Sequence, residues 1–179
     1  MTLERAAAPD PYDFLPPVPE FALTSDDLVA GERLDLDHVY SGAGGDNVSP
    51  HLEWSGFPEA TRSFAVTVFD PDAPTGSGWW HWQVINIPAD IAEMPRGAGA
   101  PDGHGLPQGA VQMRNDYGEP GFGGAGPPPG DVGHRYFFVV HALDTDHLDL
   151  GPDTTAAVVG FHLTAHALAR ATLVTTYSH

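Results

Sequence analysis

Three stretches of the chain carry apolar residues on both alternate faces, which is the pattern of strands buried on two sides. They read RSFAVTVFD at 62–70, WQVINIP at 82–88 and RYFFVVHALD at 135–144. β-branched and aromatic residues dominate them, and proline, glycine or aspartate stands at their ends. We therefore predict three central strands that are covered on both faces.

The remaining extended segments are shorter and less regular. Residues 21–42 predict two short strands around a turn at Gly31, and a further short strand is expected near Trp54. Residues 89–134 show little periodicity of either kind. A loop of this length inside a compact domain usually carries function, so this segment is a candidate for shaping a site.

One segment near the end has the spacing of a helix. Residues 152–174 repeat apolar positions at intervals of three and four, with Asp153 or Thr154 as the expected N-cap. The residues on the expected buried face are Val158, Phe161, Ala165, Leu168 and Thr172. We predict a single helix over this range.

These elements predict a β-rich fold, an antiparallel β-sandwich or β-rich α+β domain with a late helix. A parallel α/β fold is disfavoured because helical patterns do not alternate with the strands. Residues 1–20 contain five prolines and predict an extended N-terminal arm. The absence of a repeat or linker predicts that residues 21–179 form one domain.

Composition narrows the classes of partner. The 21 glycines and 18 prolines agree with many turns. Seven arginines, no lysine and 24 acidic residues give a formal charge of −17, which repels phosphate backbones and anionic bilayers. We therefore expect no nucleic-acid binding and no stable membrane association, and we read the acidity mainly as an aid to solubility.

The chain has no cysteine, so disulfides, thiol nucleophiles and thiolate-bound metals are excluded. No apolar stretch reaches the roughly 18 residues of a membrane span, and the N-terminus lacks the pattern of a signal peptide. The expected location is the cytoplasm.

Polar side chains gather where the central strands meet their loops. Asp70 ends one strand, His81 begins the next, and His134 and Tyr136 begin a third. If these strand ends share one edge of the sheet, the four side chains converge on one pocket. Two imidazoles and a phenol offer hydrogen-bond donors to a phosphate, sulfate or carboxylate, and a neighbouring aspartate raises the pKa of an imidazole.

Other chemistries fit the pattern less well. Two histidines and Asp70 could form a facial metal site, but the short His spacings of compact ligand sets are absent, so we expect no metal and no cofactor. The HLTAH segment at 162–166 lacks the glutamate of a zinc protease, and the glycine-rich 121–130 lacks the lysine of a phosphate-binding loop. Ser77 lies in TGSGW, which departs from the hydrolase pattern G-x-S-x-G.

Taken together, the motifs resemble the phosphatidylethanolamine-binding protein family, in particular its bacterial, Raf kinase inhibitor-like branch. The resemblance lies in residues 49–88, 115–144 and 167–177 and covers nearly everything after residue 20. Its specific features are D-P-D-A-P followed by G-x-x-H-W, and then P-P-x-G-x-x-x-H-R-Y.

The resemblance implies an antiparallel β-sandwich with a small pocket for phosphate-like groups at one end. The residues that it would place at this pocket are Asp70, His81, His134 and Tyr136, with Ala73, Pro74, Gly126 and Pro127 as walls and Trp79 at the mouth. It also implies a cis peptide bond in the D-P-D-A-P turn, for which Ala73–Pro74 is the candidate, and a homodimer, to which the tryptophan cluster at 79–82 would contribute.

The chain departs from the family in two places. Bacterial members often have a cysteine in the segment before P-P-x-G, where this chain reads GGAGPPPG. The C-terminal helix that shapes the pocket in animal members is of another type here. Lipid binding and kinase inhibition are therefore not carried over to this chain.

The sequence thus predicts a non-enzymatic, regulatory binding protein whose partner is a small ligand with a phosphate or carboxylate group. An enzyme remains the alternative, a hydrolase or lyase with His81 and His134 as acid and base and Asp70 orienting them. Inhibition of a protease or kinase through a protein contact at the pocket mouth is a third.

Overall fold

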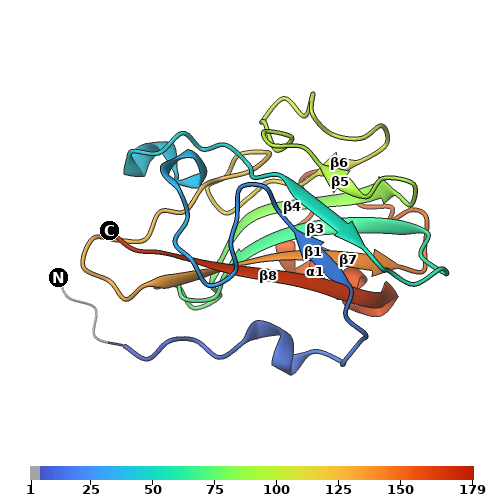
Figure 1. Cartoon of the computed structure of the whole chain (residues 1–179), viewed down its shortest axis with the longest axis horizontal. Coiled ribbons are helices and arrows are strands. Elements are labelled where there is room, and N and C mark those ends of the chain that lie inside the picture. Colours follow the sequence, from blue (N-terminus) through green and yellow to red (C-terminus); the bar gives the residue numbers. More distant parts are fainter. Residues whose placement is uncertain (1–4) are drawn as a thin grey trace.

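The computed structural model describes residues 5–179 and shows two antiparallel sheets packed face to face, with one α-helix (Figure 1). The smaller sheet has the order β1-β2-β5, formed by Ala22–Thr24, Leu52–Ser55 and Glu93–Met94. The larger sheet has the order β6-β4-β3-β7-β8, formed by Val111–Gln112, Trp79–Pro88, Ser63–Asp70, His134–Leu143 and Ala167–Tyr177. The predicted antiparallel sandwich is confirmed.

The larger sheet contains the three strands that the sequence predicted as central. β3 lies in its middle, and all eight of its residues are buried, as the apolar pattern on both faces predicted. One face packs against the smaller sheet, where Trp54 of β2 meets Phe64 of β3 with ring centroids 5.4 Å apart. Aromatic contacts of this kind bury much of the area that holds two sheets together.

The opposite face of the larger sheet is partly covered by α1, Ala156–His166. Val159 and Leu163 of this helix pack with Ala65, Ile85 and Leu143 of the sheet. The helix is much shorter than the predicted 152–174, and its buried face is not the predicted one, because Phe161 is 72% exposed. Its N-cap is Thr155 rather than Asp153 or Thr154, and that side chain makes no capping hydrogen bond.

The second half of the predicted helix is a strand. Residues 167–177 pair along the length of β7, and Ala169, Ala171 and Leu173 are buried at every second position. The apolar residues of this segment fit both a period of two and a period of 3.6. Pairing with β7 decides between them, since tertiary contacts outweigh the helix propensity of alanine and leucine.

The 21–42 prediction is also corrected in part. β1 lies at the expected place, and Gly31 forms the turn with a φ of +80°. The second strand is absent, however, and the chain forms a short 3-10 helix at Leu36–His38 and another at Ser41–Ala43. Within the 21–42 segment, only residues 22–24 therefore pair with a strand of the smaller sheet.

β4 is interrupted twice by an extra residue relative to β3. Val68 pairs with Trp82 and Phe69 with Trp80, so His81 between them has no partner in the register. The same happens near the other end, where Asn86 adopts a φ of +59°. Such bulges turn a side chain away from the regular alternation of a strand.

The N-terminal segment runs beside β8 along the lower side of the molecule in Figure 1. Arg170 of β8 donates its backbone N–H to Pro19 and accepts one from Phe21, and a short 3-10 helix at Pro11–Phe14 places Tyr12 over Phe137 and His141. Across residues 5–179, no helix combines the length and apolar character that a membrane crossing requires.

Candidate functional site

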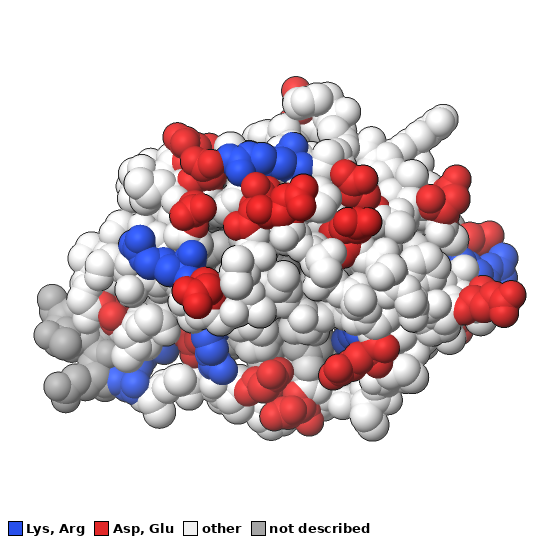
Figure 2. Space-filling view, in the orientation of Figure 1, with Lys and Arg blue, Asp and Glu red and all other residues white. Residues whose placement is uncertain are grey.

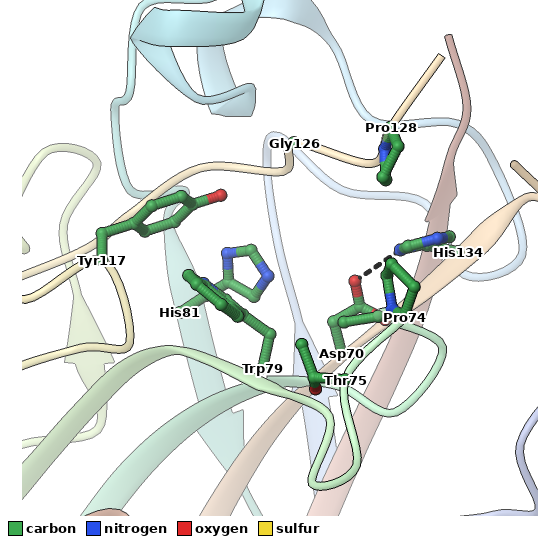
Figure 3. Close-up of a pocket in the computed structure, with 10 residues that line it drawn as sticks. Asp70, Pro74, Thr75, Trp79, His81, Tyr117, Gly126, Pro128 and His134 are labelled. Carbon is green, nitrogen blue, oxygen red and sulfur yellow. Dashed lines mark hydrogen bonds and ion pairs between the residues drawn. The ribbon is translucent and has the colours of Figure 1, made fainter. Parts of the chain in front are cut away.

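Three strand ends meet at one end of the larger sheet and enclose a cavity of about 200 Å³. Asp70, the last residue of β3, pairs with Trp79, the first of β4, and His134 begins β7 beside them. Figure 3 shows Asp70 and His134 on one side of this cavity and His81, Trp79 and Tyr117 on the other. The lining residues are Asp70, Ala73, Pro74, Thr75, Trp79, His81, Tyr117, Gly126, Pro128 and His134.

Most of the residues expected at the pocket lie together on this cavity, but two do not line it. Pro128 takes the place expected for Pro127. Tyr136 lies behind the wall, 1% exposed, with its ring 5.2 Å from that of His81. Within residues 5–179 its hydroxyl has no hydrogen-bond partner, and burial together with the charge of Asp70 raises the pKa of Tyr136 far above its ordinary value.

His81 owes its direction to the bulge in β4. The bulge lets Trp80 and Trp82 take opposite faces of the sheet and sends the intervening imidazole into the cavity. Its Nδ1 lies 2.7 Å from the carbonyl oxygen of Gly123, whereas Nε2 is buried with no hydrogen-bond partner in the described chain. Burial lowers the pKa of His81, and the opposing charge of Asp70 does not overcome it.

His134 stands in a chain of charged groups. Its Nδ1 lies 2.7 Å from Oδ2 of Asp70 and its Nε2 lies 3.0 Å from Oδ2 of Asp131. Burial opposes protonation of His134, which is 1% exposed, but the hydrogen bonds to the two carboxylates outweigh it and raise the pKa of His134. A protonated His134 therefore donates both of its N–H groups to protein carboxylates.

Arg5 extends this chain from the N-terminal segment. Its guanidinium lies 2.9 Å from Oδ2 of Asp131 and 3.3 Å from Nε2 of His134, and it also donates to the backbone carbonyl of Asp72. The Arg5 guanidinium holds the pKa of Asp131 far below its usual range. Sequence reasoning missed both residues, although Asp131 lies three positions before His134, in the loop that leads to it.

Asp72, in the turn after β3, stabilises the fold and does not line the cavity. Its carboxylate is buried and accepts two bonds from the Arg135 guanidinium, Nε to Oδ2 at 2.7 Å and Nη2 to Oδ1 at 2.9 Å. It also accepts the backbone N–H of Ala8, which ties the N-terminal segment to this corner. Burial opposes ionisation, but the bonds from Arg135 outweigh it and lower the pKa of Asp72.

Tyr117, which sequence reasoning missed, closes the cavity from the long 89–134 loop. Its ring stacks on Tyr40 with centroids 4.1 Å apart, and its hydroxyl donates to the carbonyl of Gly124 at 3.0 Å. Glycine is required opposite, because a Cβ at Gly123 would lie 2.4 Å from the Tyr117 ring. The aperiodic, glycine-rich character of this loop was the available signal, but it did not single out Tyr117.

The turn after Asp70 differs from expectation in one respect. All described peptide bonds are trans, so the cis bond expected at Ala73–Pro74 is wrong. The turn closes without it, because Thr75 donates its N–H to Ala73 and its hydroxyl to Gly78. Trans is the lower-energy isomer of an X–Pro bond, by about 0.5–1 kcal/mol.

The three clustered tryptophans have three different environments. Trp79 lines the cavity and meets Tyr117 edge to face, with centroids 5.1 Å apart. Trp82 is fully buried between the sheets. Trp80 packs on Phe69 on the outer face and lines a second, apolar cavity of about 460 Å³ between the N-terminal segment and α1.

Unpaired hydrogen-bonding atoms, rather than a cluster of metal-ligating side chains, characterise the first cavity. In the described part of the chain, no three His, Cys, Asp or Glu side chains are grouped so that they could hold a metal ion. Three buried polar atoms in this region have no partner in residues 5–179: Nε1 of Trp79 in the lining, the hydroxyl of Tyr136 behind the wall, and Nε2 of His81 in the lining. The first two are hydrogen-bond donors.

Comparison with known proteins agrees with the fold. A family model described as phosphatidylethanolamine-binding protein matches residues 24–178. The UPF0098 protein YbcL of Escherichia coli K12 is 54% identical over 159 residues, covering 88% of this chain and 87% of YbcL. The UPF0098 protein YbhB of the same organism is 48% identical over 161 residues, covering 87% of this chain and 99% of YbhB.

Solved structures give the same result. The crystal structure of E. coli YbcL, described as a new member of the mammalian PEBP family, superposes with a TM-score of 0.87 at 53% identity and covers 89% of this chain and 99% of that one. A homologue from Chlamydia trachomatis gives a TM-score of 0.74 at 29% identity, with 89% and 98% covered. The resemblance read from the sequence is confirmed: this chain belongs to the phosphatidylethanolamine-binding protein family.

Proposed function

We propose that this protein binds a small ligand through a phosphate or carboxylate group held in the cavity between Asp70, His81 and His134, and that it acts as a binding, regulatory protein. The observation that carries the proposal is the pair of unpartnered, buried polar atoms on residues that line that cavity, Nε1 of Trp79 and Nε2 of His81. Buried polar groups without partners are rare in folded proteins, and a site that awaits a ligand is one of their few explanations.

The size of the cavity supports a small group. A volume of about 200 Å³ equals several water molecules, each of which occupies about 30 Å³ in the liquid. A phosphate group has five heavy atoms and fits such a space. The name of the family, phosphatidylethanolamine-binding protein, also refers to a ligand that contains a phosphate group.

The acidic surface is compatible with an anionic ligand because the two effects act over different ranges. Figure 2 shows that the basic side chains on this face each lie beside acidic ones, so they offer no broad positive surface. At physiological salt, charges beyond about 8 Å are largely screened, whereas hydrogen bonds inside the cavity act at contact. The same acidity favours a partner other than nucleic acid or an anionic bilayer.

Binding is favoured over catalysis by the hydroxyl groups at the cavity. Thr75 is the aliphatic hydroxyl in its lining, and it donates to the carbonyl of Gly78 at 2.6 Å rather than to a histidine. The hydroxyl of Tyr117 is likewise committed to a carbonyl. An activated nucleophile needs a base within hydrogen-bond reach, which neither residue has.

Ligand protection against thermal unfolding tests this proposal. Inorganic phosphate is expected to raise the melting temperature of the wild type, and the variants His81→Phe and Trp79→Phe are expected to lose most of that rise because each removes one unpartnered hydrogen-bonding atom from the lining. Tyr12→Phe is the matched control, since its hydroxyl faces Thr67 on the outer side of the sheet. The proposal fails if phosphate protects all four proteins equally or protects none.

A further inference from the structure

Arg170 of β8 is a buried arginine without a carboxylate partner. Of the seven arginines in the chain, Arg33 is exposed, and five form ion pairs with aspartates, namely Arg5, Arg62, Arg96, Arg114 and Arg135. Arg170 is only 8% exposed and forms no ion pair within residues 5–179. Burial of an unpaired guanidinium is unfavourable, so this side chain calls for an explanation.

The neighbours of Arg170 do not replace a carboxylate. Nη1 and Nη2 both lie 3.5 Å from the carbonyl oxygen of Pro16, at the outer limit of a hydrogen bond. Nε is buried and has no partner in the described part of the chain. The ring of Tyr12 lies 5.5 Å from Cζ, and the register partner on β7 is His141, which carries no negative charge. Most of the N–H donors of this guanidinium are therefore unused.

The guanidinium adjoins a third cavity, of about 400 Å³, between β8 and the N-terminal segment. Small-molecule sites have volumes of about 300–1,000 Å³. The backbone of Arg170 is fixed there, because its N–H donates to Pro19 and its carbonyl accepts from Phe21. The third cavity shares no lining residue with the first one. Most of its wall comes from residues 10–20, which precede the region matched by the family model.

Carboxylates line the same cavity. They belong to Asp10, Asp13 and Glu20, and the last two of these side chains are exposed. Oδ1 of Asp10 caps the short 3-10 helix by accepting the N–H of Tyr12 at 2.8 Å. The cavity thus combines one buried positive group with three negative groups. A complementary ligand has a carboxylate and more than one positive group.

We propose that the third cavity is a separate binding site for a free basic amino acid, such as lysine or arginine. The α-carboxylate of the ligand pairs with Arg170, and its two cationic groups face Asp10, Asp13 and Glu20. An anion without a positive group would be repelled by the three carboxylates, and an amine without a carboxylate would leave the guanidinium unpaired. This site does not depend on the proposed phosphate binding, because different residues build it.

Three probes of similar length test the charge pattern. Cadaverine is lysine without its carboxylate, and norleucine is lysine without its side-chain ammonium. In titration calorimetry of the wild type at about pH 7 and constant ionic strength, we expect L-lysine to bind at least about tenfold more tightly than either, since each lost contact involves a charged hydrogen bond. The comparison with cadaverine is stringent, because the acidic surface attracts its two positive charges more strongly.

Two variants locate the site. Arg170→Met removes the guanidinium and is expected to bind lysine at least about tenfold more weakly, without weakening cadaverine. Its fold is checked by the melting temperature, which should not fall, because replacing a buried unpaired charge by an apolar side chain is often neutral or stabilising. Glu20→Gln should also weaken lysine, whereas Glu59→Gln, the same change at an exposed position outside the cavity, should not.

The outcomes decide the inference without involving the first cavity. Preference for lysine in the wild type and its loss in Arg170→Met support it. Equal binding of lysine and cadaverine by the wild type overturns it, and so does equal binding of lysine by the wild type and a folded Arg170→Met. If Arg170→Met does not fold, the pair Glu20→Gln and Glu59→Gln decides, and equal affinities of these two overturn the inference. Absence of binding by all three probes also overturns it, because Arg170 then pairs with a carboxylate of the chain in solution.

Discussion

The two bulges of β4 have opposite consequences for their side chains. At one end of the strand, Asn86 adopts a left-handed conformation and forms two bonds with the backbone of Leu148: Nδ2 donates to its oxygen at 3.1 Å, and Oδ1 accepts its N–H at 2.8 Å. At the other end, His81 forms one bond with Gly123 and leaves Nε2 without a partner in the described chain.

The difference agrees with a structural role for the bulge at Asn86 and with the proposed ligand-binding role for the bulge at His81. Both side chains are buried, so each polar atom that is left unpaired lowers the free energy of unfolding. Asn86 satisfies its amide and fixes the loop at Leu148, as a structural residue does. His81 keeps an unsatisfied atom, and the folded state tolerates it at the wall of a cavity.

An unpaired nitrogen alone would not be enough for this interpretation. His141 also has a buried nitrogen, Nδ1, without a partner in residues 5–179, but it lies under Tyr12 and does not line the cavity. Burial lowers the pKa of His141 to about 3, so it stays neutral. The combination of an unpaired atom and an adjoining cavity distinguishes His81.

Removing the Asn86 amide is expected to give the largest loss of stability. Asn86→Ala leaves the N–H of Leu148 buried and unpaired, at about 1–3 kcal/mol, whereas the carbonyl of Leu148 still accepts the N–H of Leu150 at 2.9 Å. The variant also places alanine in a left-handed conformation, at about 1 kcal/mol. We expect a loss of about 3 kcal/mol in the free energy of unfolding, measured by urea denaturation, with phosphate binding unchanged.

Asn86→Gly separates the two causes. Glycine tolerates the positive φ, so this variant should lose only about 2 kcal/mol, less than the alanine variant. A loss below about 1 kcal/mol in both variants would contradict a structural role for this bulge and remove the contrast with His81.

A smaller, pH-dependent effect on stability is expected at the cavity end of the larger sheet, where His134 begins β7. The pKa of His134 is raised, so its stabilising contribution is complete below its ordinary value of about 6.5 and is lost as the pH rises through the folded value. A neutral His134 can donate to Asp70 or to Asp131 but not to both. The destabilisation caused by His134→Gln should therefore be about 1.5 kcal/mol smaller at pH 9 than at pH 6.

Asn86→Gly again provides the control, because its hydrogen bonds involve no titrating group and its loss should be the same at both pH values. The chain has no lysine or cysteine to titrate in this range. If His134→Gln lowers the free energy of unfolding equally at both pH values, the hydrogen-bonded charges of Asp70, His134 and Asp131 do not stabilise this end of the sheet.

The sequence predicted the strands correctly where hydrophobic pattern and pairing agree. β3 and β7 begin or end within one residue of the predicted 62–70 and 135–144, because β-branched and aromatic residues there suit no other element. The 167–177 segment was misread because its alanines and leucines satisfy a helical period as well. That ambiguity is resolved only by the contacts with β7, which no local pattern contains.

The sequence predicted which site residues lie where strands meet loops, but it did not predict how their side chains are arranged. The positions of Asp70, His81 and His134 at strand ends follow from the chain order of the strands. The bulge that aims His81, the position of Tyr136 behind the wall and the entry of Tyr117 and Arg5 depend on register and on distant segments. Register shifts leave no periodic mark in one sequence, so these features had to be observed.

His81→Phe should change stability less than the Asn86 and His134 variants. The wild type contains one orphaned acceptor, Nε2, and the variant replaces it with another, the carbonyl of Gly123. The two costs are similar, about 1–3 kcal/mol each, so the net change in the free energy of unfolding should be within about 1 kcal/mol. Protection by phosphate should nevertheless disappear, because the phenyl ring offers no hydrogen-bonding atom to a ligand in the cavity.

This pairing of a small change in stability with a complete loss of binding opposes the result expected for Asn86→Ala, where stability falls and binding remains. Urea denaturation and phosphate titration of both variants measure the two quantities on the same samples. If His81→Phe instead costs as much as Asn86→Ala, then Nε2 has an intramolecular partner in solution and the bulge serves the fold. If it costs little and still binds phosphate, the ligand does not use His81, and the contrast between the two bulges has no functional meaning.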